Sequence, residues 1–268
     1  METIKILVLG DTVGKPGREA CRKMIPKLRD KLGLDLVVDN GENLANGSSL
    51  TRETTEELFE HGVDVITTGD HIFKKKEATA VLEENPRVLR PLNYPKGTPG
   101  QGFIVVTTEK GIKVAVINLM GRVFMQPLDC PFQTVQSILK TIRPQTKIIL
   151  VDLHAEATSE KVAMGWFLDG EVSAIYGTHT HVQTADERIL PSGTAYMTEL
   201  GMTGPYYSVI GRDIQQVLHR FRTQLPGPMD VATEDVRLSG AVIEIDVETG
   251  RAVSIQRIHE KLNGSDYS

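Results

Sequence analysis

Four histidines of this chain follow short apolar runs. His179 and His181 stand two residues apart in the stretch YGTHTHVQT, His154 follows IILVDL, and His71 follows VITTGD. Imidazole groups bind metals and exchange protons near neutral pH. A single His-x-His pair arises often by chance, but four of the seven histidines stand at the ends of such runs. This pattern favours a shared metal site over four unrelated surface residues.

Acidic and amide side chains stand at the same kind of position. LVLGD ends at Asp11, LVVDNGEN ends at Glu42 and Asn43, and VITTGDH places Asp70 beside His71. Turn residues are expected after strands on local grounds, which accounts for the glycines and some of the acids but not for the histidines. Ligands of open α/β sheets collect outside the carboxyl ends of the strands. We therefore expect the residues that follow five predicted strands to lie together in one site.

The donor types indicate which metals this site would hold. Carboxylate, amide oxygen and imidazole ligands suit manganese, iron or zinc better than calcium, and the lack of thiolates argues against a structural zinc site. Seven or so ligands exceed the need of one ion and suit two ions that share a carboxylate, for which Glu42 is the central candidate. Such an ion pair can hold a bridging hydroxide and stabilise in-line displacement at phosphorus. The sequence thus predicts hydrolysis of a phosphate ester.

Alternating strand and helix patterns fill the first two-thirds of the chain, which is typical of βαβ units. The predicted strands are Ile4–Leu9, Leu36–Val38, Val63–Thr67, Lys113–Ile117, Lys147–Val151 and Val172–Tyr176. The predicted helices are Gly17–Leu32, Arg52–Glu60, Lys75–Glu84, Phe132–Thr141 and Thr158–Leu168.

The region after Ala185 has a different pattern. RILPSGTAYMTE and RLSGAVIEIDVETGRAVSIQRIHE predict hairpins, the second with ETG as its turn. Asn93–Gly102 and Leu225–Asp230 are predicted loops, and the final NGSDYS is expected to fray. We expect a mixed sheet system packed by helices in a single domain that spans residues 1–268.

Bulk composition excludes several classes of protein. Of 268 residues, 40% are hydrophobic and 24% are charged, and no apolar run approaches the roughly 20 residues that cross a bilayer. The N-terminus lacks the pattern of a signal peptide, and Cys21 and Cys130 form neither a disulfide framework nor a zinc spacing. We therefore expect a soluble, cytoplasmic protein. The net charge of −5 argues against an extended binding surface for nucleic acid but does not exclude binding of a small nucleotide.

Many motifs in one order carry a family resemblance. They are ILVLGDTVGKPGR, VVDNGENLANGSSLT, GVDVITTGDHIFKKKE, LRPLNYP, NLMGRVFM, VDLHAEATSEK and YGTHTHVQTADERILPSGTAYMTELGMTGPYYSVIG. Together they resemble the calcineurin-like metallophosphoesterases, in a divergent bacterial branch whose members look like 2′,3′-cyclic nucleotide phosphodiesterases. The resemblance implies a four-layer αββα sandwich with mixed sheets, and a site for two metal ions, iron or manganese before zinc.

The resemblance also implies a role for each candidate residue. The first metal would be held by Asp11, Glu42, Asn43 and His181. The second metal would be held by Glu42 again, with Asp70, His154 and His179. His71 would donate a proton to the departing oxygen after attack by a metal-bridging hydroxide, in keeping with a group that titrates near neutral pH.

Two positions depart from the pattern of the broader family. The broader family usually has an Asp-x-His motif here, but Asp11 is followed by Thr12 and Val13. The histidine is therefore absent, which removes one imidazole from the first metal. Asp70 stands where asparagine is commoner. We expect its carboxylate to favour a hard or trivalent ion and to weaken the Lewis acidity felt by the phosphate.

These observations predict that the protein is a phosphodiesterase acting on a small cyclic nucleotide. Two alternatives remain open. One is a regulatory protein that binds nucleotides or RNA-processing machinery and keeps its metals for structure. The other is a metal hydrolase for C–N bonds, which the ligand order disfavours. Exposed late strands could support a homo-oligomer. Lys74–Lys76 could attract an anionic substrate or simply begin a solvated helix, and Tyr206 and Tyr207 receive no role.

Overall fold

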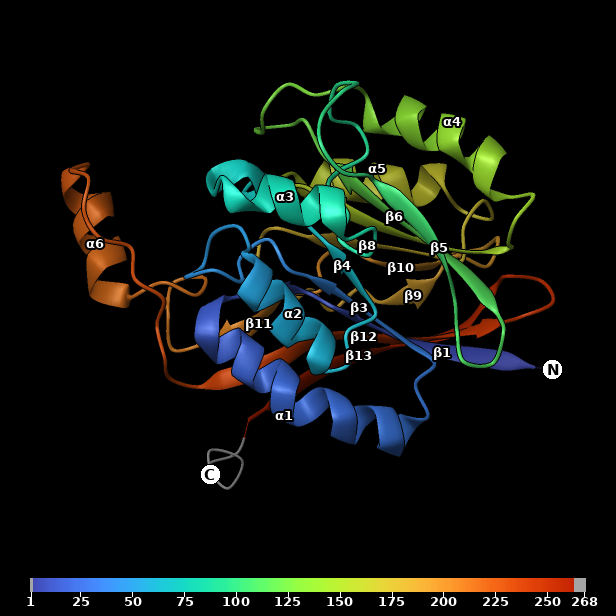
Figure 1. Cartoon of the computed structure of the whole chain (residues 1–268), viewed down its shortest axis with the longest axis horizontal. Coiled ribbons are helices and arrows are strands. Elements are labelled where there is room, and N and C mark those ends of the chain that lie inside the picture. The colour runs from blue at the N-terminus through green and yellow to red at the C-terminus, as the bar shows by residue number, and fades with distance from the viewer. Residues whose placement is uncertain (1, 263–268) are drawn as a thin grey trace.

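The computed structural model describes residues 2–262, which form two facing β-sheets with helices on both outer faces (Figure 1). The predicted frayed tail, residues 263–268, lies outside the described residues. The first sheet has the order β2-β11-β12-β1-β3-β4, with β13 paired to β12. Its strands are β1 (Thr3–Leu9), β2 (Asp11–Thr12), β3 (Leu36–Asn40), β4 (Val65–Thr67), β11 (Met202–Pro205), β12 (Val236–Asp246) and β13 (Ala252–Lys261).

The second sheet has the order β5-β6-β7-β8-β10-β9. Its strands are β5 (Phe103–Thr107), β6 (Lys113–Met120), β7 (Ile148–His154), β8 (Ala174–Thr178), β9 (Arg188–Ile189) and β10 (Ala195–Met197). The neighbouring strands β1, β3 and β4 run parallel in the first sheet, and the neighbouring strands β6, β7 and β8 run parallel in the second. The carboxyl ends of parallel strands share an edge, so the loops after these six strands can build one site.

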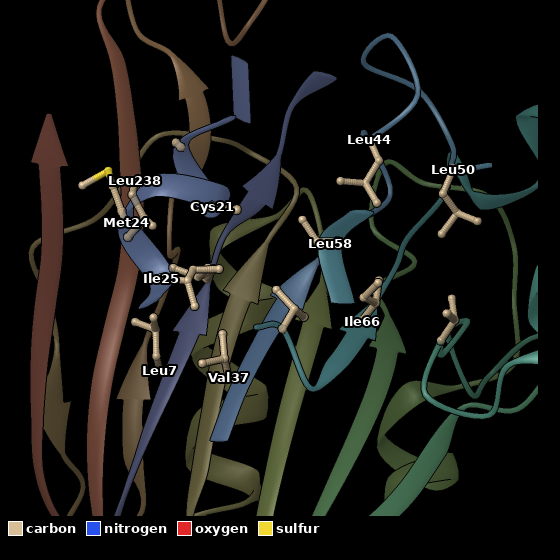
Figure 2. Packing of buried hydrophobic residues seen from close by; sticks show 14 of the residues in the cluster. Leu7, Cys21, Met24, Ile25, Val37, Leu44, Leu50, Leu58, Ile66 and Leu238 are labelled. Atoms are coloured by element: carbon tan, nitrogen blue, oxygen red, sulfur yellow. The ribbon is translucent and has the colours of Figure 1, made fainter. Parts of the chain in front are cut away.

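Three apolar layers hold the fold together. Helices α1 (Gly14–Leu32), α2 (Arg52–Glu60) and α3 (Glu77–Glu84) pack on the outer face of the first sheet, and Figure 2 shows Ile25 of α1 beside Leu7 and Val37 of that sheet. A second layer lies between the two sheets. Helices α4 (Pro131–Ile142) and α5 (Thr158–Phe167) close the outer face of the second sheet. This αββα order confirms the predicted fold class.

Most of the predicted helices and strands are present, and the structure corrects the residues at which some of them end. Helix α2 has the predicted bounds, whereas β6 and β7 run three residues further than predicted, so that β7 ends at His154 itself. The second predicted hairpin is confirmed as β12 and β13, and the first as β9 and β10. The sequence analysis missed β5, which pairs antiparallel with β6 at the edge of the second sheet.

It also missed helix α6 (Ile214–Thr223), which stands away from the two sheets in Figure 1. Only Val217 of this helix is buried, while Leu218 and Phe221 are exposed. Ile214, Val217, Leu218 and Phe221 nevertheless have the i, i+3, i+4, i+7 spacing of an amphipathic helix, so the sequence did carry a signal for α6. Asp213 caps its first turn by accepting a hydrogen bond from the Gln216 amide.

Within residues 2–262, the helices are all too short or too polar to cross a lipid bilayer.

Candidate metal centre

The strand ends bring all eight predicted site residues together. Asp11 follows β1, Glu42 and Asn43 follow β3, and Asp70 and His71 follow β4. From the second sheet, His154 ends β7, and His179 and His181 follow β8. Seven of the eight form two groups that meet at Glu42, and the distances within each group define what it can hold.

Four of these side chains form a tight group, called here the Glu42 cluster: Glu42, Asp70, His154 and His179. One ligand atom from each lies within 4.8 Å of all the others. His154 Nε2 is at the middle, 3.2 Å from Glu42 Oε2, 3.2 Å from Asp70 Oδ1 and 3.0 Å from His179 Nδ1. Two carboxylates and two imidazoles therefore point at one small volume.

The other three predicted ligands, Asp11, Asn43 and His181, form a second group, called here the Asp11 set. Asn43 Nδ2 lies 3.4 Å from Asp11 Oδ1 and 3.3 Å from His181 Nε2, and the latter is 3.5 Å from Asp11 Oδ1. Asn43 Nδ2 also lies 3.2 Å from Glu42 Oε1. Glu42 thus faces both groups, one with each carboxylate oxygen.

Each of the three histidines has its second ring nitrogen occupied by another partner. His154 Nδ1 lies 2.9 Å from Thr178 Oγ1, and because that hydroxyl donates to Asp152, the imidazole must donate to the hydroxyl. His179 Nε2 lies 3.1 Å from Glu156 Oε2, and His181 Nδ1 lies 3.0 Å from the Ile210 carbonyl. These partners accept hydrogen bonds from the outer nitrogens, which therefore carry the protons. In the neutral imidazoles the inner nitrogens then carry the lone pairs, which is the form that binds metals.

The loop that carries two of these histidines is held in an unusual backbone conformation. His179 and His181 have φ values of 96° and 63°, in a region that is uncommon for residues other than glycine. Glu199 accepts hydrogen bonds from the backbone amide and the hydroxyl of Thr180, and Lys161 lies 2.6 Å from the same carboxylate oxygen. This buried ion pair fixes the turn that directs both imidazoles inward.

The charges of the site are set by its neighbours. Burial alone would raise the pKa of Glu42 and of Asp11, but His154 and His181 respectively hold these pKa values below their usual range. Burial would lower the pKa of His154, yet Glu42, Asp70 and Asp11 raise it well above its usual value. Burial lowers the pKa of His179, with His154 adding to the effect. The centre therefore attracts positive charge strongly.

The donor set fits metal ions. His154 Nε2 and His179 Nδ1 lie 3.0 Å apart beside the carboxylates of Glu42 and Asp70, and a metal ion there would take the place of the proton that these carboxylates favour on His154. Gly69 allows both side chains to approach the backbone closely, because a Cβ there would lie 2.1 Å from His154 Nε2 and 2.4 Å from Glu42 Oε2. Carboxylate and imidazole donors suit manganese, iron and zinc.

His71 lies beside the two groups and contacts Glu42 and Asn43, but it is not one of the four members of the Glu42 cluster. Its Nδ1 is 3.0 Å from Asn43 Oδ1 and 3.2 Å from Glu42 Oε1, and its backbone amide donates to Glu42 Oε2. The contact with Glu42 raises the pKa of His71, although burial opposes the shift. Asp70 Oδ2, at 3.7 Å, is too far from Nε2 for a hydrogen bond. Nε2 is therefore available to a substrate.

A buried polar layer beneath the metal centre was missed by the sequence analysis. Asp152 accepts hydrogen bonds from Asn40, Thr67 and Thr178, and burial raises its pKa to about 6. One signal was present in the sequence. Asp152 lies two residues before His154 on the same strand and hence on the same face.

The remaining candidates lie around this centre. Lys74–Lys76 sits where a 3₁₀ turn meets α3, and nothing in the structure ties it to the ligands. Tyr206 is half-buried, and its hydroxyl is hydrogen-bonded to Ser239 and to the Met202 carbonyl. Tyr207 is exposed. A cavity of about 820 Å³ lies on the outer side of His181.

Comparison with known proteins gives consistent results. A family model described as YmdB-like protein matches residues 7–258. A 2′,3′-cyclic-nucleotide 2′-phosphodiesterase from Bacillus subtilis is 48% identical over 255 residues, which cover 95% of this chain and 96% of that protein.

Two crystal structures extend the comparison. A novel phosphatase from Mycoplasma pneumoniae has a TM-score of 0.92 and 34% identity, covering 100% of this chain and 97% of that one. A candidate 5′-nucleotidase from Staphylococcus aureus has a TM-score of 0.65 and 14% identity, covering 99% of this chain and 57% of that one, and this likeness concerns the fold alone. The resemblance predicted from the motifs is confirmed, and the chain belongs to the YmdB-like protein family.

Proposed function

We propose that this protein is a two-metal phosphodiesterase that hydrolyses 2′,3′-cyclic nucleotides. The observation that carries the proposal is the set of three histidines whose outer nitrogens are occupied and whose inner nitrogens face buried carboxylates. The name of the Bacillus subtilis relative supports the substrate class.

The ligand assignment follows the two groups. The Glu42 cluster would hold one ion and the Asp11 set the other, with Glu42 shared between them. When bound, two such ions would supply a nucleophile derived from water and polarise the phosphoryl oxygens. Iron or manganese fits the mixed oxygen and nitrogen donors best, and zinc is the next choice.

The protein's own contribution to the reaction is acid catalysis and orientation. Water adds to phosphorus and loses a proton to solvent, the bond from phosphorus to one ribose oxygen breaks, and His71 Nε2 donates a proton to that oxygen. Solvent then returns a proton to His71. His71 Nδ1 is held by Asn43 Oδ1 and Glu42 Oε1, which keeps Nε2 turned away from these acceptors. The product is a nucleoside monophosphate.

The test combines metal analysis with hydrolysis of 2′,3′-cyclic AMP. We expect about two ions per chain in the wild type and in His71→Ala, with turnover of the variant reduced about 100-fold or more, a typical contribution of a general acid. His219→Ala on α6 is the matched control and should resemble the wild type. Full metal content without turnover of any phosphodiester would refute the enzymatic proposal and favour a regulatory role. The single domain, the cytoplasmic location, RNA-processing partners and self-association stay predictions.

A further inference from the structure

The segment Gly121–Met125 (GRVFM) has no role in the proposed chemistry, yet it adjoins the metal centre. It follows β6, whose last residue Met120 is paired with the candidate ligand His154. The Gly121 amide donates a hydrogen bond of 2.9 Å to the His154 carbonyl. Phe124 is four residues beyond Met120, and four residues reach at most about 14 Å. Because β6 runs parallel to β7 and ends beside His154, the segment leaves the sheet at the edge of the centre, and it is called here the rim segment.

A buried carboxylate holds this rim segment in place. Glu160, in the first turn of α5, is 8% exposed and accepts hydrogen bonds from the backbone amides of Arg122 and Val123 at 3.1 and 3.2 Å. A Cβ on Gly121 would lie 2.5 Å from Glu160 Oε2, so the close approach requires glycine there. Burying a carboxylate is costly unless it is fully hydrogen-bonded. The hydrogen bonds to Glu160 therefore fix the backbone at Arg122 and Val123.

The residue that this anchor presents is an aromatic ring in solvent. Phe124 has a φ of 62°, a left-handed conformation that is a rare and strained choice for a bulky residue. Its side chain is 89% exposed, so packing against residues 2–262 offsets neither the strain nor the exposure of apolar surface. Backbone strain of this kind concentrates at ligand-binding positions that the surrounding structure fixes.

We propose that Phe124 is the residue on which the substrate's nucleobase stacks when its phosphate lies at the metal centre. This inference rests on the proposed function and adds a position that determines substrate preference. Every nucleobase has an aromatic face, and stacking on a protein ring is tolerant of sequence. A phenylalanine without a polar atom should accordingly favour substrates that carry a base without choosing among bases.

The test compares two cyclic diesters that differ only in the base. One is 2′,3′-cyclic AMP, and the other is methyl β-D-ribofuranoside 2,3-cyclic phosphate, which has the same ring and phosphate but no base. In Phe124→Ala we expect KM for 2′,3′-cyclic AMP to rise about tenfold with kcat nearly unchanged, as loss of one stacking contact predicts. Kinetics on the base-free compound should not change.

Two further variants separate stacking from damage to the fold. Phe124→Tyr keeps an aromatic face and should restore the wild-type KM. Phe221→Ala removes a ring that is 73% exposed on α6, and it should leave both substrates unaffected. The stacking proposal alone would be overturned if Phe124→Ala had the same ratio of kcat/KM for 2′,3′-cyclic AMP to kcat/KM for the base-free compound as the wild type. This includes the case in which kcat/KM falls equally on both compounds. Absence of wild-type turnover on both compounds would overturn the proposed function and this inference with it.

Discussion

Two buried groups of charged side chains lie at the same edge of the fold and are built in opposite ways. Glu199 is balanced within the chain, because Lys161 Nζ lies 2.6 Å from its carboxylate and backbone amides satisfy the rest. The Glu42 cluster gathers carboxylates and two imidazoles around one point with no lysine or arginine within salt-bridge distance among the described residues. The first group supplies its own cation and fixes a loop. The second needs a cation from outside.

The largest expected effect comes from the residue that faces both metal groups. Glu42→Gln removes the shared negative charge, and we expect kcat/KM to fall about 1000-fold or more, since a metal centre supplies several kcal/mol of transition-state stabilisation. The measurement is steady-state hydrolysis of 2′,3′-cyclic AMP together with metal content. Glu248→Gln, on an exposed turn, is the control. Wild-type turnover in Glu42→Gln would contradict the shared-ligand assignment.

The self-balanced pair should matter most for folding. Lys161→Met leaves the buried Glu199 carboxylate unpaired, and removal of one partner of a buried ion pair costs about 3–5 kcal/mol. Urea unfolding measures this loss. The double variant Lys161→Met/Glu199→Gln should recover part of it, because the unpaired charge is gone. A loss below about 1 kcal/mol in the single variant would mean that the pair does not stabilise the loop.

The cluster that needs an outside cation should respond to metal removal. We expect Mn²⁺ at 100 times its dissociation constant to raise the unfolding free energy by about 2.7 kcal/mol, since it binds only the folded chain. His179→Ala should abolish most of this gain, while His219→Ala should keep it. Denaturant melts with and without a chelator give the values. Equal gains in the wild type and His179→Ala would argue that the ion binds elsewhere.

The smallest expected effect is at Asp70, where the chain has a carboxylate in place of the commoner asparagine. Asp70 Oδ1 lies 3.2 Å from His154 Nε2 and 3.4 Å from His179 Nδ1, so its charge acts directly on that group. Asp70→Asn should retain the metal less tightly, with turnover per bound metal equal or higher by up to about tenfold. Titration of the metal and kinetics at saturating metal separate the two effects. No change in either would show that the extra charge is unimportant.

The sequence predicted much of this molecule because its signals were local. Strand periodicity and the polar residue after each strand placed Asp11, Glu42, Asp70 and His154 at one edge, and parallel pairing brings such ends together. The roles of these residues came from the family resemblance. The structure adds the partners that set each imidazole's protonation.

What the sequence could not show depends on contacts between distant segments. The pairing of Lys161 with Glu199 spans 38 residues, and the bond between the His179 amide and Asp11 spans 168. The left-handed backbone of Phe124 has no sequence signature at a residue that normally avoids it.

The central claim is that two ions share Glu42, and electron paramagnetic resonance of the Mn²⁺-loaded protein tests it most directly. Metal analysis should give about two manganese ions per chain. The spectrum should then be that of an exchange-coupled pair, as expected for ions a few ångströms apart with a common carboxylate. One ion per chain, or two with the spectra of isolated ions, would contradict the account.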